Sequence, residues 1–154
     1  MKNYLVFIFF VVLCEGAGIA SALLAGPAGS DWYLSLEKPF FNPPGWIFGP
    51  AWTLLYFLMA WAVYRIWKAG GEKKDKLLAV FFIHLVFNFL WSVIFFRWQS
   101  VGGAFLDIII LDILVIYLII LFYNRDRTAS FLMLPYLAWI LFATLLNGYI
   151  LLLN

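Results

Sequence analysis

Hydrophobic side chains dominate this chain in five long runs, which are separated by short polar or proline-rich segments. Each run reaches the roughly 20 residues that an α-helix needs to cross a bilayer. Strands of a membrane barrel would instead alternate apolar and polar residues over about 10 positions, so the continuous apolar pattern predicts helices. The five predicted helices cover residues 4–25, 46–67, 77–96, 103–123 and 129–153.

Short connections follow the second, third and fourth predicted helices, at residues 68–76, 97–102 and 124–128. Because such connections force neighbouring helices to run antiparallel, the sequence predicts an all-α, five-helix transmembrane bundle that forms a single domain over residues 1–154. The first run continues to Ala25 without a cleavage site, so it is interpreted as a retained helix and not as a signal peptide. An odd number of helices argues against a two-fold inverted-repeat transporter.

The segment between the first two predicted helices, residues 26–45, is not an ordinary polar connector. From Trp32 to Trp52 the chain carries four prolines and seven aromatic residues in 21 positions. Proline restricts the backbone and lowers the entropy that is lost on ordering, and aromatic rings provide large packing surfaces. We therefore expect residues 26–45, hereafter the lid segment, to fold back over the helix ends and to cover a space beneath them.

The composition supports a membrane protein and excludes several other classes. Of the 154 residues, 66% are hydrophobic and 12% are charged, with a mean hydropathy of +1.00, which leaves too little charge to cover a soluble domain. The net charge of +2 is too small to suggest a nucleic-acid partner. Cys14, the only cysteine, lies in an apolar run and is expected to be a small buried hydrophobe. A single histidine argues against a dedicated metal site.

Lysine and arginine are distributed unevenly between the two ends of the predicted bundle. One end holds eight of them: Lys2, Arg65, Lys68, Lys73, Lys74, Lys76, Arg125 and Arg127. The other end holds Lys38 and Arg97. Because positive charge is enriched on the cytoplasmic side of membrane proteins, this asymmetry predicts a cytoplasmic N-terminus and places the lid segment and the C-terminus outside.

Four ionisable side chains lie within the apolar runs, namely Glu15, His84, Asp107 and Asp112. Such groups are costly in a membrane and are often functional. For each acid, an uncharged or hydrogen-bonded contact between helices is favoured over a role in proton relay. The first helix is also rich in small residues between Gly16 and Ala25, which permit close helix packing or leave room for a ligand.

Two predicted helix faces each present a large aromatic residue and an amide: His84, Asn88 and Trp91 on the third helix, and Trp139, Ala143 and Asn147 on the fifth. If the two faces meet, they form an apolar cavity with a few polar groups, which is typical of a small-molecule site. Helix packing with interhelical hydrogen bonds from asparagine explains the same spacing equally well. Four tryptophans lie inside the runs, where an interfacial belt does not place them: Trp52, Trp61, Trp91 and Trp139.

Three motifs together resemble the translocator protein family, also called tryptophan-rich sensory proteins or peripheral-type benzodiazepine receptors. The first motif is Trp32-Tyr-x-Ser-Leu-x-Lys-Pro-x-Phe-x-Pro-Pro-x-Trp46, followed by Gly49-Pro-x-Trp52 and Leu55-Tyr56. The second is Asn88-x-x-Trp91 with Phe95-Phe96. The third is Pro135-Tyr-Leu-Ala-Trp139-x-x-Phe-Ala143-Thr-x-x-Asn147. The resemblance extends over nearly the whole chain.

The resemblance implies a five-helix membrane protein, commonly a homodimer, with a pocket that opens toward the loop between helices one and two. Members bind porphyrins such as protoporphyrin IX, isoquinoline carboxamides and benzodiazepines, and animal members bind cholesterol. Some bacterial members promote light- and oxygen-dependent breakdown of protoporphyrin. The chain looks like a bacterial member because it stops directly after the fifth predicted helix, which implies the bacterial cell membrane.

The resemblance also implies site residues. The pocket positions would be Tyr33, Trp52, Asn88, Trp91, Trp139, Ala143 and Leu146, with Pro43 and Pro44 at the rim. Trp52 and Trp139 would be the residues tied to porphyrin breakdown, and no resident cofactor is implied. Animal members carry a basic residue after the helix-five tyrosine for cholesterol, whereas Tyr149 is followed here by Ile-Leu-Leu-Leu-Asn. Sterol recognition by that route is therefore not expected.

Several functions remain open at this point. The favoured one is a membrane binding protein for planar, hydrophobic small molecules such as porphyrins. An enzyme would have to rely on a photoexcited ligand, because the sequence offers no nucleophile with its base and no metal site. A transporter of porphyrins or other small hydrophobic molecules needs a continuous polar path, and the polar residues are scattered. A scaffold whose aromatic residues merely fill the bundle would bind no specific ligand.

Overall fold

The computed structural model describes residues 2–26 and 30–154, so Met1 and residues 27–29 of the lid segment lie outside the described part. Within these ranges the secondary structure is helical and contains no strand. Five segments are long and apolar enough to cross a membrane: Asn3–Ala25, Gly45–Ala69, Lys74–Arg97, Val101–Tyr123 and Arg127–Leu153. The predicted all-α class with five spanning helices is thereby confirmed.

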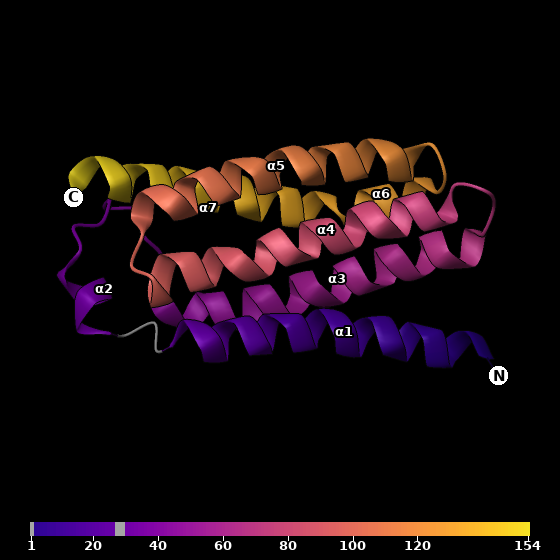
Figure 1. Cartoon of the computed structure of the whole chain (residues 1–154), viewed down its shortest axis with the longest axis horizontal. Coiled ribbons are helices and arrows are strands. Elements are labelled where there is room, and N and C mark those ends of the chain that lie inside the picture. Colours follow the sequence, from indigo (N-terminus) through magenta and orange to yellow (C-terminus); the bar gives the residue numbers. More distant parts are fainter. Residues whose placement is uncertain (1, 27–29) are drawn as a thin grey trace.

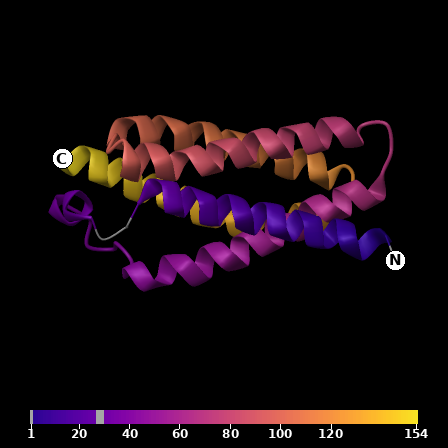
Figure 2. The same cartoon turned by 60° about the horizontal axis from the view of Figure 1, so that its bottom comes forward.

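The spanning segments are built from long helices and short turns. The long helices are α1 (Lys2–Ala25), α3 (Phe48–Ala69), α4 (Lys74–Ser92), α5 (Val101–Tyr123) and α7 (Leu134–Leu153). The short elements are α2 (Asp31–Ser35), the 3₁₀ turn η1 (Gly45–Ile47), the π-helical turn η2 (Val93–Arg97) and α6 (Arg127–Leu132). The long helices lie side by side in one elongated bundle, with the N-terminus at one end and the C-terminus at the other (Figures 1 and 2).

The core of the bundle lies where α1 packs on α3, and where α5 packs on both α4 and α7. Its fully buried side chains include Cys14, Met59, Phe81, Leu118 and Tyr136. Large apolar side chains also cover the outside of the bundle, such as Val12 and Ile113, each more than 60% exposed. Apolar side chains on the outside are favourable against lipid and unfavourable against water. Each helix also satisfies its backbone hydrogen bonds internally, as the bilayer requires.

One glycine allows α1 to approach α3 closely. A Cβ atom at Gly18 would lie 2.2 Å from Cε2 of Tyr56, a distance at which real atoms do not coexist. Ser21, one turn further on, donates a hydrogen bond to the carbonyl oxygen of Phe89 at 2.9 Å and so ties α1 to α4. The small residues of α1 therefore serve helix packing at these positions, one of the two uses that the sequence left open.

Two of the predicted helices are interrupted in the structure. The predicted helix 129–153 is divided at Met133 into α6 and α7, because Pro135 has no N–H to donate to the preceding turn. The predicted helix 77–96 begins at Lys74 and changes to a π-helical turn after Ser92, where the N–H of Trp98 donates to the carbonyl of Val93 at 3.0 Å. Hydrophobicity did not reveal this second change.

The connection between α3 and α4 requires glycine. Gly70 and Gly71 have φ angles of +60° and +89°, a backbone conformation that residues with a Cβ atom rarely adopt. The guanidinium group of Arg125 donates hydrogen bonds to the carbonyl oxygens of Ala69 and Gly70. These contacts satisfy carbonyl groups at the end of α3 and join the α3–α4 turn to the α5–α6 turn.

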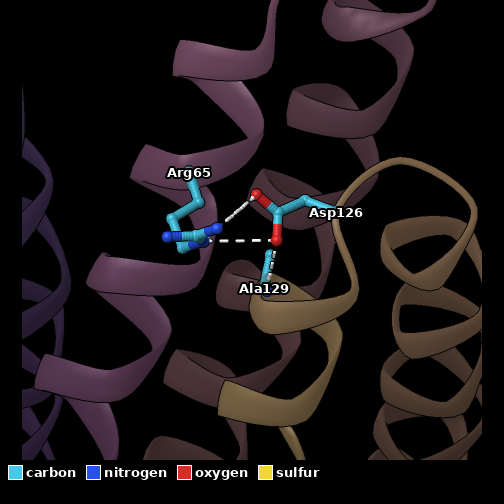
Figure 3. A network of polar contacts seen from close by, with 3 residues as sticks. All are labelled: Arg65, Asp126 and Ala129. Atoms are coloured by element: carbon cyan, nitrogen blue, oxygen red, sulfur yellow. Dashed lines mark hydrogen bonds and ion pairs between the residues drawn. The ribbon is translucent and has the colours of Figure 1, made fainter.

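A second arginine joins α3 to the start of α6 (Figure 3). The Nε atom of Arg65 lies 3.2 and 3.1 Å from the two carboxylate oxygens of Asp126, and its Nη2 atom lies 2.9 Å from Oδ2. The same carboxylate caps α6 by accepting a hydrogen bond from the N–H of Ala129 at 3.0 Å. Partial burial alone would raise the pKa of Asp126, but the hydrogen bonds from Ala129 and Arg65 outweigh it, so this pKa lies below its ordinary 3.8.

Stability is expected to depend on the ionisation of Asp126. Because its pKa is lowered in the folded protein, the carboxylate contributes stability above pH 3.8, and this contribution is lost as the pH falls through the lowered pKa. Asp126→Asn should therefore lower the melting temperature at neutral pH but not at the acidic limit. Asp126→Ala should cost about 1 kcal/mol more, because it also removes the helix cap. A difference between wild type and Asp126→Asn that persists at low pH would contradict this assignment.

The basic residues occupy opposite ends of the bundle in the way that the sequence predicted. Arg65, Arg125 and the Lys73–Lys76 segment lie at the end that also carries the N-terminus. Lys38 lies in the lid segment, which Figure 1 shows beside the C-terminus at the other end, and Arg97 ends η2 on that same side. The structure thus separates the two charge groups along the bundle axis.

Candidate functional site

The described part of the lid segment packs on the ends of α7 and η2. The ring of Trp32 lies 5.6 Å from that of Phe95, and Phe41 lies 5.3 Å from Tyr149, both edge to face. The amide of Asn154 pairs with the backbone of Glu37, accepting from its N–H and donating to its carbonyl oxygen, both at 3.0 Å. The segment is therefore held to the bundle at several points by aromatic packing and by a two-way hydrogen bond.

A cavity of about 330 Å³ lies beneath the lid segment. Helix α1 contributes small residues, the lid segment and α3 contribute aromatic and small ones, and α4, η2 and α7 close the remaining walls. The lining residues are Ala22, Ala25, Gly26, Tyr33, Asn42, Gly45, Phe48, Trp52, Trp91, Ser92, Phe95, Phe96, Trp139, Ala143, Leu146, Asn147 and Ile150. The walls are thus mostly aromatic and aliphatic, with a few polar side chains, the usual character of a small-molecule pocket.

The structure brings together most of the residues that the resemblance implied. Six of them line the cavity: Tyr33, Trp52, Trp91, Trp139, Ala143 and Leu146. Pro43 and Pro44 do not line it, although they lie between Asn42 and Gly45, which do. Their backbone conformation directs the chain from the lid segment into η1, whose preceding residue Pro44 has φ −57° and ψ 139°.

Asn88 does not line the cavity; it is buried, and its amide is hydrogen-bonded within the protein. Its Oδ1 atom accepts a hydrogen bond from the Tyr56 hydroxyl at 2.6 Å, and its Nδ2 atom donates to the Tyr136 hydroxyl at 3.0 Å. The ring of Trp52 lies 5.4 Å from that of Tyr56 and 6.3 Å from that of Tyr136. Asn88 therefore joins the two tyrosines whose rings pack against Trp52. His84, from the same predicted face, is fully buried and does not line the cavity.

Of the two helix faces that the sequence pattern singled out, Trp91 of α4 and Asn147 of α7 make a direct contact. The indole N–H of Trp91 donates a hydrogen bond to Oδ1 of Asn147 at 3.1 Å. The Nδ2 atom of Asn147 donates in turn to the carbonyl oxygen of Val101 at 3.0 Å. Asp112, one of the intramembrane acids, accepts a hydrogen bond from the Thr144 hydroxyl at 2.8 Å and so joins α5 to α7.

Several lining residues were absent from the predicted site. Phe95 and Phe96 lie in η2 and both line the cavity; they were part of a motif but were not assigned to the pocket. Phe48 lies one helical turn before Trp52 and its ring lies 5.9 Å from Trp139. Ala22 and Ala25 make room in the wall, which is the second use that the sequence left open for the small residues of α1.

The electrostatics of the cavity are simple. Among the described residues, those that line it carry no formal charge. Burial raises the pKa of the Tyr33 phenol above its ordinary value, an effect that the Asn42 side chain partly offsets by hydrogen bonding, so the phenol is neutral at physiological pH. Over residues 2–26 and 30–154, histidine, cysteine and acidic side chains do not gather in a group that could hold a metal ion. The site can bind by stacking, apolar contact and hydrogen bonding.

Comparison with known proteins agrees with the motifs. Residues 10–153 match the TspO/MBR family. The chain is 45% identical over 152 residues to the tryptophan-rich protein TspO of Archaeoglobus fulgidus, with 99% of each chain covered. It is 36% identical to the TspO of Chlorobaculum tepidum over 99% of this chain and 98% of the relative, and 34% identical to the human translocator protein over 86% and 79%. The chain is therefore an integral membrane protein that belongs to the TspO/MBR family.

Proposed function

We propose that this protein is a membrane binding protein for tetrapyrroles such as protoporphyrin IX and for drug-like aromatic molecules of the isoquinoline carboxamide and benzodiazepine type. The observation that carries the proposal is the cavity beneath the lid segment, whose walls present Trp52, Trp91 and Trp139 with three phenylalanines. Aromatic pairs contribute about 0.5–1.5 kcal/mol each beyond the burial of their area. Planar, hydrophobic ligands gain most from such walls.

The volume of the cavity favours a particular mode of binding. At about 330 Å³ it lies at the lower end of the roughly 300–1,000 Å³ that ligand pockets occupy. A drug-sized aromatic molecule fits within such a space. A tetrapyrrole macrocycle is larger than this cavity, so one edge of the bound macrocycle has to extend toward the lid segment. The lid segment can adjust to that edge, because it is held to the bundle by side-chain contacts and by few hydrogen bonds from its backbone.

The proposal predicts that two indoles dominate binding. Trp52→Ala and Trp139→Ala should each weaken protoporphyrin IX about tenfold, since each removes a stacking partner and apolar area worth about 1.4 kcal/mol. Trp98→Ala is the matched control, because Trp98 is 65% exposed and does not line the cavity. The shift of porphyrin absorbance on titration measures affinity without relying on tryptophan fluorescence. Equal affinities in all three variants, or no saturable binding by the wild type, would reject the proposal.

Light-driven breakdown of the bound porphyrin is a second candidate. It is favoured by the position of Trp52 and Trp139, two oxidisable indoles in the wall of the cavity. Chemistry at this site would start from the photoexcited ligand and require dioxygen, because the lining supplies no nucleophile with its base. Loss of porphyrin absorbance should therefore need both light and oxygen. The same rate of loss in the dark would reject this activity.

Transport of porphyrins or other small hydrophobic molecules across the membrane is the alternative to binding alone. The cavity lies at the lid end of the bundle, and toward the other end the fully buried Met59 and Tyr136 fill the space between the helices. This arrangement supports binding over transport. Uptake of protoporphyrin IX into liposomes that contain the protein, compared with the Trp52→Ala variant, distinguishes the two.

The proposal includes a membrane location and an assembly. We place the protein in the bacterial cell membrane as a homodimer, with the N-terminus and the end rich in basic residues in the cytoplasm. Cysteine labelling at Ser35 in the lid segment should then succeed from outside the cell, and labelling at Glu72 should not. The reverse result would overturn this orientation, and a monomer by light scattering in detergent would overturn the dimer.

A further inference from the structure

The cavity differs in polarity between its inner part and its lid end. The inner walls are apolar and are formed by Trp52, Trp139 and Ala143. Nearer the lid end, the amide of Asn147 is hydrogen-bonded to both Trp91 and Val101. The lid segment contributes Tyr33 and Asn42. The Asn42 amide donates to the Pro43 carbonyl at 3.3 Å and to the Tyr33 phenol oxygen, whereas the Tyr33 hydroxyl keeps its own hydrogen to donate. Unused hydrogen-bonding capacity therefore lies at the lid end.

A lysine stands directly behind this end of the cavity. The Nζ atom of Lys38 lies 4.5 Å from the centre of the Tyr33 ring, and it donates one hydrogen bond of 2.9 Å to the carbonyl oxygen of Leu36. An ammonium group has three donors, so two remain available. Within the described residues Lys38 makes no ion pair, and the flexible stem of lysine allows the group to move toward the cavity mouth.

We infer that Lys38 is the anion-recognising residue of this site, and that it binds a carboxylate on the edge of an otherwise apolar, planar ligand at the cavity mouth beside Tyr33. The inference rests on the proposed function and adds the ligand's chemical class and orientation. The macrocycle enters the aromatic part with its carboxylates directed outward. The Tyr33 hydroxyl is the neighbouring donor for a second carboxylate.

The cost of burying charge makes this orientation the favourable one. A carboxylate placed in the inner part of the cavity would leave water for a surface of aromatic and aliphatic side chains such as Trp52, Trp139 and Ala143, which is strongly unfavourable. At the mouth, the carboxylate meets an ammonium group and keeps contact with solvent. Hydrogen bonds between charged groups are roughly twice as strong as neutral ones.

Arg97 is the other basic residue at this end of the bundle and provides the control. It ends η2 directly after the lining residue Phe96, and its side chain is exposed. A general attraction of anions by positive charge would involve Arg97 and Lys38 alike. Recognition by Lys38 would not involve Arg97, because it is the ammonium group of Lys38 that lies over the ring of the lining residue Tyr33.

The test compares protoporphyrin IX with its dimethyl ester, which has the same macrocycle and no carboxylates. Both are titrated into wild type, Lys38→Met, Lys38→Arg and Arg97→Gln in detergent micelles, with porphyrin absorbance as the signal. Lys38→Met, which keeps an unbranched stem over Tyr33, should weaken protoporphyrin IX about tenfold or more and leave the ester within about twofold. Lys38→Arg should retain most of the affinity, and Arg97→Gln should bind both ligands as the wild type does.

Each other outcome contradicts a stated part of the proposal. Equal losses for acid and ester in Lys38→Met would show that Lys38 acts through the packing of Tyr33 and would overturn anion recognition. An equal loss for the acid in Arg97→Gln would replace recognition by general attraction. Unchanged affinity in Lys38→Met would reject the inference while the proposed function stands. Absence of saturable binding of both ligands to the wild type would reject the proposed function and this inference with it.

Discussion

Replacing Ala143 with phenylalanine should lower the affinity for protoporphyrin IX at least about a hundredfold, which corresponds to about 2.7 kcal/mol. The methyl group of Ala143 forms part of the wall that α7 presents to the cavity, between Trp139 and Asn147. A phenyl ring at this position projects into a space of only about 330 Å³ and occupies the volume that a ligand needs. The loss should appear for the ester as well as for the acid, since shape and not charge is changed.

The matched control for this variant is Ala138→Phe on the same helix. Ala138 is exposed on the outside of α7 and does not line the cavity, so the added ring meets lipid. Both variants should fold, because the first fills an existing space and the second extends into the bilayer. Titration of both by porphyrin absorbance measures the effect. Similar affinities for the two variants would show that ligands bind somewhere other than this cavity.

Replacing Gly18 with alanine should lower the free energy of unfolding by about 1–4 kcal/mol. Overpacking and the loss of a buried hydrogen bond destabilise the fold, and a gain of about 1 kcal/mol in helix propensity offsets part of that loss. The new methyl group would lie 2.2 Å from the ring of Tyr56, which is 7% exposed and held by Asn88. The ring has to move, and the 2.6 Å hydrogen bond to Asn88 is broken. Because Tyr56 supports Trp52, ligand affinity should fall with stability.

Gly16→Ala tests whether this effect is local. A Cβ atom at Gly16 has nothing within 4 Å, so alanine fits there without strain and should leave stability unchanged or raise it by up to about 1 kcal/mol. Thermal unfolding followed by circular dichroism in detergent micelles compares the two variants. If Gly18→Ala is as stable as Gly16→Ala, then α1 does not depend on the close approach to Tyr56.

The spanning helices could be predicted from sequence because each depends on a property that adds up over about 20 residues. Length and hydropathy suffice to place the spanning helices. The turn formed by Gly70 and Gly71 lies within the polar connection that separates two of the hydrophobic runs. The break at Met133 follows from one residue, Pro135, whose effect a hydropathy average does not register. The π-helical turn at Val93–Arg97 packs against α1, α4 and α5, and the hydropathy pattern does not distinguish it from the α-helix before it.

The candidate site could be predicted in part, for a similar reason. Trp139 and Ala143 share one face of α7, and helical spacing alone places them together. Asn88 shares a face of α4 with Trp91, but it does not line the cavity. Its amide is instead hydrogen-bonded to the hydroxyl groups of Tyr56 and Tyr136, which come from other helices. Spacing along one helix does not tell which partner satisfies an amide. Contacts between helices of this kind become visible only in three dimensions.

The π-helical turn has a consequence for how the chain length can vary. A π-helical turn accommodates one residue more than an α-helical turn, so Val93–Arg97 behaves as a one-residue insertion within a spanning segment. Deleting one residue there would restore regular α-helical winding and leave the following residues in phase, whereas the same deletion in a regular turn of α4 would rotate them by about 100°, given 3.6 residues per turn. A one-residue deletion should therefore disturb the bundle less at this turn than elsewhere in a spanning segment, and its cost should fall on the cavity wall, where Phe95 and Phe96 are neighbours.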